Sequence, residues 1–193
     1  MNERVEVDAG LDAFALEQVD EVLGGDVPGR VRREGTASET ADGGVEPQLS
    51  RDERTLVANL ASELRSLLDG DTDDPSLRRL FPPAYDEEAD ETAYRDLMGS
   101  ELLNGRREAL ELLARTANQK RLSADEADAW LRALNDLRLV LGTRLDVQED
   151  MLLDNLRPDD PRASGLAIYG WLSWLQEQLV AALSAGLEEG TAP

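Results

Sequence analysis

Leucine and alanine residues recur at spacings of three and four positions through most of the chain after residue 50. This spacing places apolar side chains on one face of an α-helix and leaves polar residues on the other. A short helical turn is also expected after Pro75, because proline suits the first position of a helix. The pattern predicts longer helices over about residues 50–69, 93–98, 101–117, 123–142 and 166–187.

Two serine residues mark where helices are expected to begin. Ser50 is followed by Glu53, and Ser123 is followed by Glu126. In a capping box the serine hydroxyl accepts from the amide three residues later, and the glutamate carboxylate accepts from the serine amide. The two spacings therefore predict helix starts directly after Ser50 and Ser123.

Glycine residues mark expected helix ends and interruptions. Gly70 and Gly142 follow apolar periodic segments, so each is expected to end or bend its helix. Gly99 is expected to interrupt the helix that starts near residue 93. Ser100 is then expected to cap the helix that follows.

The first 49 residues carry a weaker pattern. Residues 11–23 are expected to form a short amphipathic helix, and Arg30–Glu34 is expected to pair with Val45–Leu49 in a small β-hairpin. The segment from residue 24 to 47 is rich in glycine, proline, threonine and acidic residues, which is typical of mobile turns. The expected organisation is an acidic, partly flexible extension over residues 1–49, a helical domain over 50–187 and a tail over 188–193.

The choice of aliphatic residues favours helices over sheets. The chain has 33 leucines, 11 valines and one isoleucine, and leucine suits helices whereas the β-branched residues suit strands. With 193 residues, of which 41% are hydrophobic, the chain can bury the core of one domain. The expected fold is therefore mainly all-α, a compact multi-helix bundle with a small N-terminal β-hairpin.

Acidic residues dominate the charge of the chain. It has 41 acidic and 20 basic residues, and its formal net charge is −21 at pH 7. Such a surface repels the phosphates of nucleic acids and attracts basic protein surfaces, so a protein partner is expected and direct nucleic-acid binding is not. The N-terminus lacks a signal-peptide pattern, and the apolar stretch Gly165–Leu187 carries Glu177 at its middle. A cytoplasmic protein that does not enter a membrane is expected.

The residue types that most often carry catalysis are missing from the sequence. It has no histidine and no cysteine, which excludes thiol chemistry and Cys/His zinc sites within it and removes the usual general base near neutral pH. Asp69, Asp71 and Asp73 begin like a calcium-binding loop, but Leu80 stands where that loop needs a bidentate glutamate. No cofactor and no metal site are expected, and the chain is expected not to be an enzyme.

The segment Trp130–Leu145 holds the candidate site, because charged side chains lie within its apolar stripe. Arg138 lies in the stripe, Arg144 projects toward the same side and Asn135 lies at the edge. A guanidinium in this position needs a partner or access to water. In one interpretation, Asp136 or acids from another helix satisfy it in a structural polar network; in the other, the arginines bind a carboxylate of a partner or ligand.

Trp174 is a candidate for a partner-binding surface. It falls outside the apolar stripe that begins at Ile168 on the last predicted helix. A tryptophan off the core face either packs against a neighbouring loop or anchors a partner or a second copy of the chain. The sequence therefore leaves a homo-oligomer open.

Four segments in order resemble one actinobacterial family: LFPPAY (80–85), EADETAYRDL (88–97), AWLRALNDLRLVLGTRL (129–145) and YGWLSWLQEQLV (169–180). The family was long catalogued as a domain of unknown function. It is similar to the AosR group of oxidative-stress regulators of transcription, which act through a sigma-factor partner. The resemblance spans about residues 50–185 and implies a mostly helical fold and a regulatory role.

Redox sensing in the AosR group is ascribed to a cysteine pair, and this chain has no cysteine. Cysteine redox sensing is therefore not expected here. The resemblance implies a non-enzymatic, transcription-associated regulator that acts through a protein partner such as a sigma factor. Two alternatives stay open: an accessory or adaptor protein in regulated proteolysis, suggested by the family's gene neighbourhood, or a helical domain that binds a small ligand.

Overall fold

The computed structural model describes residues 37–39, 44–70, 74–148 and 160–189. Over these residues the chain is mainly helical with one short hairpin, which confirms the predicted fold class. The helix predicted over residues 11–23 and the tail from residue 190 lie outside the described residues. In chain order the elements are β1 (Ala37–Glu39), β2 (Val45–Pro47), α2 (Arg51–Asp69), the 3₁₀ helix η1 (Pro75–Arg79), α3 (Glu88–Thr116), α4 (Ala124–Arg144) and α5 (Ala163–Glu189).

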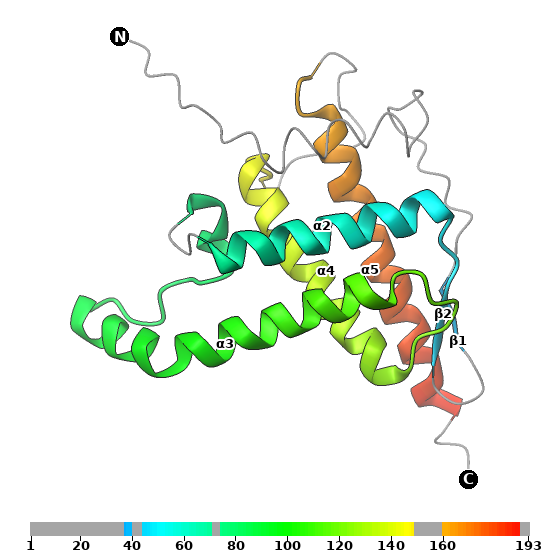
Figure 1. Ribbon diagram of the computed structural model, residues 1–193, viewed down its shortest axis with the longest axis horizontal. Helices are drawn as coiled ribbons and strands as arrows, with labels where there is room; N and C mark the ends of the chain where they lie inside the picture. Colours follow the sequence, from blue (N-terminus) through cyan, green and yellow to red (C-terminus); the bar gives the residue numbers. More distant parts are fainter. Residues whose placement is uncertain (1–36, 40–43, 71–73, 149–159, 190–193) are drawn as a thin grey trace.

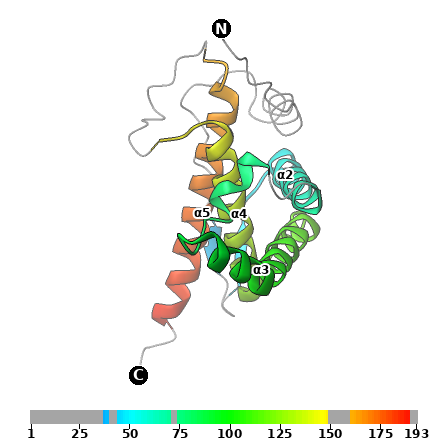
Figure 2. The ribbon, with the colours of Figure 1, turned by 90° about the vertical axis from the view of Figure 1, so that its left-hand side faces the viewer.

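The four long helices form two layers. In Figure 1, α2 and α3 lie side by side, and α4 and α5 cross behind them. The side view in Figure 2 shows α2 and α3 against one side of the α4–α5 pair. α4 is the central helix, because it contacts α2, α3, α5 and η1. One apolar core joins all four helices and includes the fully buried Trp130 and Trp171.

Both predicted capping boxes are confirmed. The amide of Glu53 donates to the hydroxyl oxygen of Ser50 at 3.2 Å, and the Ser50 amide donates to the Glu53 carboxylate at 2.7 Å. The corresponding distances for Ser123 and Glu126 are 3.2 and 2.9 Å. Gly70 is the C-cap of α2, as predicted. These local hydrogen bonds fix where the first and the central long helix start.

The helix break predicted at Gly99 is wrong. α3 runs without interruption from Glu88 to Thr116, so Gly99 and Ser100 are interior positions. Glycine costs only about 1 kcal/mol relative to alanine inside a helix, which is too little for one glycine to end a helix of 29 residues. Figure 1 shows the amino-terminal turns of α3 extending beyond α2 and α4.

The end predicted for α4 at Gly142 is two residues too early. The helix continues to Arg144, and Asp146 then adopts a left-handed backbone conformation with φ of 51°. The amide of Val147 donates back to the Gly142 carbonyl at 2.9 Å, which closes the last turn. Aspartate is one of the few residues besides glycine that tolerate this conformation. Gly142 is buried inside the last turn, where an added Cβ would lie 3.1 Å from the Tyr169 ring.

The hairpin is present, but its first strand is not the predicted one. β2 pairs antiparallel with β1, whereas the predicted partner Arg30–Glu34 lies outside the described residues. On its other edge, Val45 exchanges two backbone hydrogen bonds with Leu122, of 2.9 and 2.8 Å. Both edges of β2 are therefore occupied at this point. β1 is nearer to β2 in the sequence than the predicted strand is, so the loop between them is shorter and costs less entropy to close.

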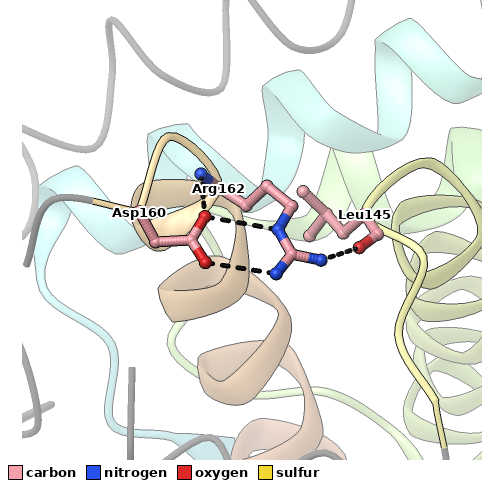
Figure 3. A network of polar contacts seen from close by, with 3 residues as sticks. All are labelled: Leu145, Asp160 and Arg162. Carbon is pink, nitrogen blue, oxygen red and sulfur yellow. Dashed lines mark hydrogen bonds and ion pairs between the residues drawn. The ribbon is translucent and has the colours of Figure 1, made fainter. Parts of the chain in front are cut away.

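Three residues fix the start of α5 against the end of α4. The Asp160 carboxylate accepts from the backbone amide of Arg162 at 2.8 Å and from its guanidinium at 3.1 and 3.2 Å. The same guanidinium donates to the Leu145 carbonyl at 3.1 Å. Figure 3 shows it between these two groups. The hydrogen bonds from Arg162 hold the pKa of Asp160 below its usual value.

A second arginine joins the start of α2 to the end of α3. Arg54 donates to the carbonyls of Ala117 and Gln119, which follow α3, at 2.8 and 2.6 Å. It also donates to the carbonyls of Leu49 and Pro47, which precede α2, at 3.0 and 2.9 Å. One guanidinium therefore satisfies four main-chain carbonyls from two segments that lie far apart in the sequence.

No helix in the described part of the chain is long and apolar enough to cross a membrane. α5 contains the apolar stretch from residue 165 to 187 and buries one of its faces in the protein core. The buried residues of α5 among those described are Gly165, Leu166, Ile168, Trp171, Leu172, Leu175, Leu179 and Ala182.

Substitutions of Gly99 test the continuity of α3. Gly99→Ala is expected to raise the free energy of unfolding by about 0.5–1 kcal/mol, since no atom in the described part of the chain lies within 4 Å of the added Cβ and alanine favours the helix. Gly99→Pro is expected to lower it by about 3 kcal/mol, because proline removes an interior hydrogen bond. Urea unfolding measures both changes; a helix interrupted at this residue would accept proline with little loss.

Candidate functional site

The four residues predicted on α4 point to three different neighbours. Asn135 and Asp136 line a groove on the side of α3. Arg138 contacts α5, and Arg144 approaches the carboxylate of Asp74, the N-cap residue of η1. The structure therefore divides the predicted cluster between three places around the central helix.

A groove of about 500 Å³ lies between α3 and α4. Its volume is in the range that can hold a small molecule or several side chains of a partner. Gly105 leaves open space on the α3 side, since no atom of the described residues lies within 4 Å of where its Cβ would be. The lining residues are Glu101, Leu102, Gly105 and Arg106 on α3, and Arg132, Asn135 and Asp136 on α4.

An ion pair between Arg106 and Asp136 forms the floor of the groove. The carboxylate of Asp136 accepts from Nη1 of Arg106, and Asp136 is only 3% exposed. Nη2 of Arg106 donates to the Leu80 carbonyl at 2.9 Å, and its guanidinium carbon lies 5.4 Å from the centre of the Phe81 ring. Burial raises the pKa of Asp136, although the hydrogen bond and the charge of Arg106 oppose this rise. The pair therefore holds the connection after η1 against α3 and α4.

The charges that line the groove leave one carboxylate unpaired. Arg106 is paired with Asp136, and Arg132 lies 3.1 Å from the Asp128 carboxylate one turn earlier on α4. Glu101 is exposed and has no ion-pair partner among the residues that the structure describes. The groove is therefore slightly anionic at the end where Glu101 lies.

Arg138 has neutral partners. Nε donates to the Ser173 hydroxyl at 2.8 Å, Nη1 donates to the amide oxygen of Gln176 at 2.5 Å, and the guanidinium carbon lies 5.5 Å from the centre of the Tyr169 ring. The expectation that Asp136 or an acid from another helix satisfies Arg138 is wrong for the described residues, because Asp136 faces α3 and the partners on α5 are neutral. Arg138 therefore joins α4 to α5 through hydrogen bonds and a cation–π contact.

Arg144 lies in a polar cluster between α2, η1 and the end of α4. Nη2 is 3.9 Å from the Asp74 carboxylate, whereas Nη1 is buried and has no hydrogen-bond partner among the described residues. Glu63 on α2 also has a buried oxygen with no described partner. Burial raises the pKa of Glu63 to about 7, although the charge of Arg144 opposes the rise. Burial acts in the same direction on Asp74, but hydrogen bonds from Ser76, helped by Arg144, hold its pKa below the usual value.

Trp174 lies apart from the groove. It is partly buried on α5, where it packs against the core. Whether it also contacts a partner stays a prediction.

Arg106 was missed by the interpretation of the sequence, although a signal for it exists. It follows Leu103 by three residues and precedes Leu110 by four, so it lies within the apolar stripe of α3. The same kind of signal singled out Arg138 on α4. A charged residue within an apolar stripe therefore marks both Arg106 and Arg138, and only Arg138 was predicted from the sequence.

The side chains that line the groove determine what it can contact. Its lining side chains offer one apolar contact, one amide and several charges, and the buried carboxylate is already paired. Among the described residues no cluster of three or more acidic side chains could hold a metal ion. The groove can therefore bind a complementary surface through charge and apolar contact.

The fold and the groove together define a class of protein, a small helical bundle with an open cleft between two of its helices. No solved structure gives a significant match to the chain. Sequence comparison provides the family: the chain belongs to the family described as a domain of unknown function, DUF2017, which matches residues 32–183.

The chain is also similar to proteins named oxidative stress regulator AosR. It is 32% identical to that of Mycobacterium tuberculosis over 80% of this chain and 89% of the relative, and the protein of Mycobacterium bovis gives the same values. A putative oxidative stress regulator AosR of Mycobacterium leprae is 32% identical over 58% of this chain and 60% of the relative. The family resemblance predicted from the four sequence segments is confirmed.

Removal of the Asp136 carboxylate is expected to destabilise the protein. Asp136→Ala leaves Arg106 without its buried partner, and we expect a loss of about 2–3 kcal/mol in the free energy of unfolding. Asp128→Ala, which breaks an exposed ion pair on the same helix, is expected to cost less than about 0.5 kcal/mol. Urea unfolding compares the two variants, and equal losses would contradict the structural role of the floor pair.

The raised pKa of Glu63 predicts a pH-dependent stability. Because the folded pKa of about 7 exceeds the usual 4.5, the folded state binds more protons between these values than the unfolded state. The resulting stabilisation is complete below about pH 4.5 and is lost as the pH rises through 7. Glu63→Gln removes this dependence, so the variant should gain stability relative to the parent protein between pH 5 and pH 8.

Thermal melting at pH 5 and pH 8 measures this difference. Glu177→Gln is the control, since Glu177 is exposed on α5. Its melting temperature relative to the parent protein should be the same at both pH values. A Glu63→Gln difference that does not change with pH would contradict the prediction.

Proposed function

We propose that this chain is a non-enzymatic regulator of the response to oxidative stress that acts by binding a protein partner of the transcription machinery, such as a sigma factor. The observation that carries the proposal is the similarity to the oxidative stress regulator AosR over 80% of the chain and 89% of the relative. Similarity over nearly the whole length of the relative supports a shared role more strongly than similarity over one part would.

The residue chemistry supports a binding role. The sequence has no histidine and no cysteine, and its formal net charge is −21. An anionic surface attracts basic protein surfaces and repels nucleic acid, which favours a partner protein over direct contact with DNA. The groove between α3 and α4 offers a place for such a partner.

The missing cysteines also bear on how the oxidant signal arrives. No thiol within these 193 residues can be oxidised, so a cysteine switch of this chain is not part of the proposal.

Affinity purification from the native host, with and without oxidant, tests the proposal. We expect a sigma factor or another transcription component to be enriched over a tag-only control, and the purified pair to bind each other directly. Enrichment of protease or chaperone subunits in place of transcription components would favour the adaptor role and contradict the proposal. Enrichment of no partner under either condition would also contradict it.

A further inference from the structure

The groove has the form that accepts a helix of a partner. It lies between two helices, α3 and α4, and the amino-terminal turns of α3 extend beyond the rest of the bundle (Figure 1). A helix placed in such a groove contacts both walls at positions three and four residues apart. The side chains along the walls then decide which kind of helix binds.

Exposed apolar side chains concentrate at this end of the molecule. Of the three large apolar side chains that are exposed among the described residues, Leu102 (43% exposed) lines the groove. Tyr85 (50%) packs edge-on against Tyr94 of α3, with ring centres 5.7 Å apart. Val180 (47%) lies on α5. The amino-terminal half of α3, together with Tyr85 just before it, therefore offers both an apolar contact and an aromatic pair to a partner.

The charge around these side chains is negative. The two arginines of the groove are paired with Asp136 and Asp128, whereas Glu101 has no ion-pair partner in the described part of the chain. From residue 86 to 101 the sequence has seven acidic residues and one basic residue, a net charge of −6. Asp86, Glu87 and Asp90 in this segment are exposed. A basic segment is therefore attracted to the surface and an acidic one is repelled.

The same charges disfavour a second copy of the chain as the occupant. In a symmetric dimer through this surface, each copy would place its own segment 86–101, of net charge −6, at the shared contact. Like charges at an interface oppose association. Nucleic acid is disfavoured for the same reason.

We infer that the groove between α3 and α4 binds a basic amphipathic helix of the partner protein, with an apolar side chain against Leu102 and a cationic side chain facing Glu101. The inference rests on the proposed function and names the surface and the partner chemistry that this function uses. Arg132 and Asn135 lie on the α4 side of the groove, the Arg106–Asp136 pair forms its floor, and the acidic segment before Glu101 attracts the partner.

Site-specific photo-crosslinking in the native host tests the position of the contact. A benzoylphenylalanine residue replaces Leu102 in one variant and Val180 in the matched control, because the two side chains are almost equally exposed. We expect a partner adduct from position 102 and none from position 180. Mass spectrometry of the adduct should identify a partner segment with net positive charge and helical apolar spacing.

An adduct at position 102 with an acidic segment, or with a second copy of this chain, would overturn the inference. The same holds for a partner that co-purifies with both variants but crosslinks only at position 180 or at neither position. In that case the proposed function would still stand. If affinity purification enriches no partner at all, the proposed function and this inference both fail.

Charge and apolar variants test the chemistry with the purified pair. Leu102→Glu is expected to weaken binding about tenfold, and Glu101→Lys about fivefold with a smaller dependence on salt. Glu177→Lys, an exposed position on α5, should leave the affinity within twofold. Circular dichroism confirms that each variant is folded, and equal affinities for all three variants would contradict the inference.

Discussion

Guanidinium groups that donate to main-chain carbonyl oxygens are the interaction on which the rest of the structure depends. The last carbonyls of a helix have no partner within it and lie at the negative end of its dipole. Arg54 satisfies two carbonyls that follow α3, and Arg107 and Arg162 satisfy the carbonyls of Leu68 at the end of α2 and Leu145 at the end of α4. Each contact joins segments that are separate in the sequence. A planar guanidinium can reach several acceptors at once, which the compact ammonium of lysine does less well, and only one of the twenty basic residues is a lysine.

Guanidinium contacts of the same kind also fix the position of α3, which forms one side of the groove. Arg106 and Arg107 are neighbours on α3 and donate in different directions, the first to Leu80 after η1 and the second to Leu68 at the end of α2. Arg106 is also paired with Asp136 on α4. α3 is therefore fixed to three other segments at the level of the groove, while its amino-terminal turns extend beyond the bundle. If the proposed partner binds there, a groove whose walls are already fixed needs few side chains to be ordered on binding.

Local interactions made most of the fold predictable from the sequence. The features that could not be predicted depend on contacts between segments that lie far apart in the sequence. The capping boxes and the helical spacing of the leucines depend on residues three or four positions apart, and these predictions were confirmed. The break at Gly99 was wrong because one glycine disfavours a helix only weakly, and α3 continues through it. At the site, a charge within an apolar stripe marked Arg138 as a residue that needs partners. The sequence could not show that its partners are neutral residues of α5, or that Asp136 faces Arg106 instead, because both depend on how the helices are placed around α4.

The most direct test of this account is the free energy of unfolding of Arg54→Lys compared with Arg65→Lys. Both residues lie on α2, but among the described residues Arg65 makes only an exposed ion pair with Glu111, at 3.4 Å. Lysine keeps the charge and loses the planar fork that reaches four carbonyls. The account predicts a loss of about 2 kcal/mol or more for Arg54→Lys and less than about 0.5 kcal/mol for Arg65→Lys. Equal and small losses for the two variants would show that charge alone suffices, and would contradict the central role given to the guanidinium contacts.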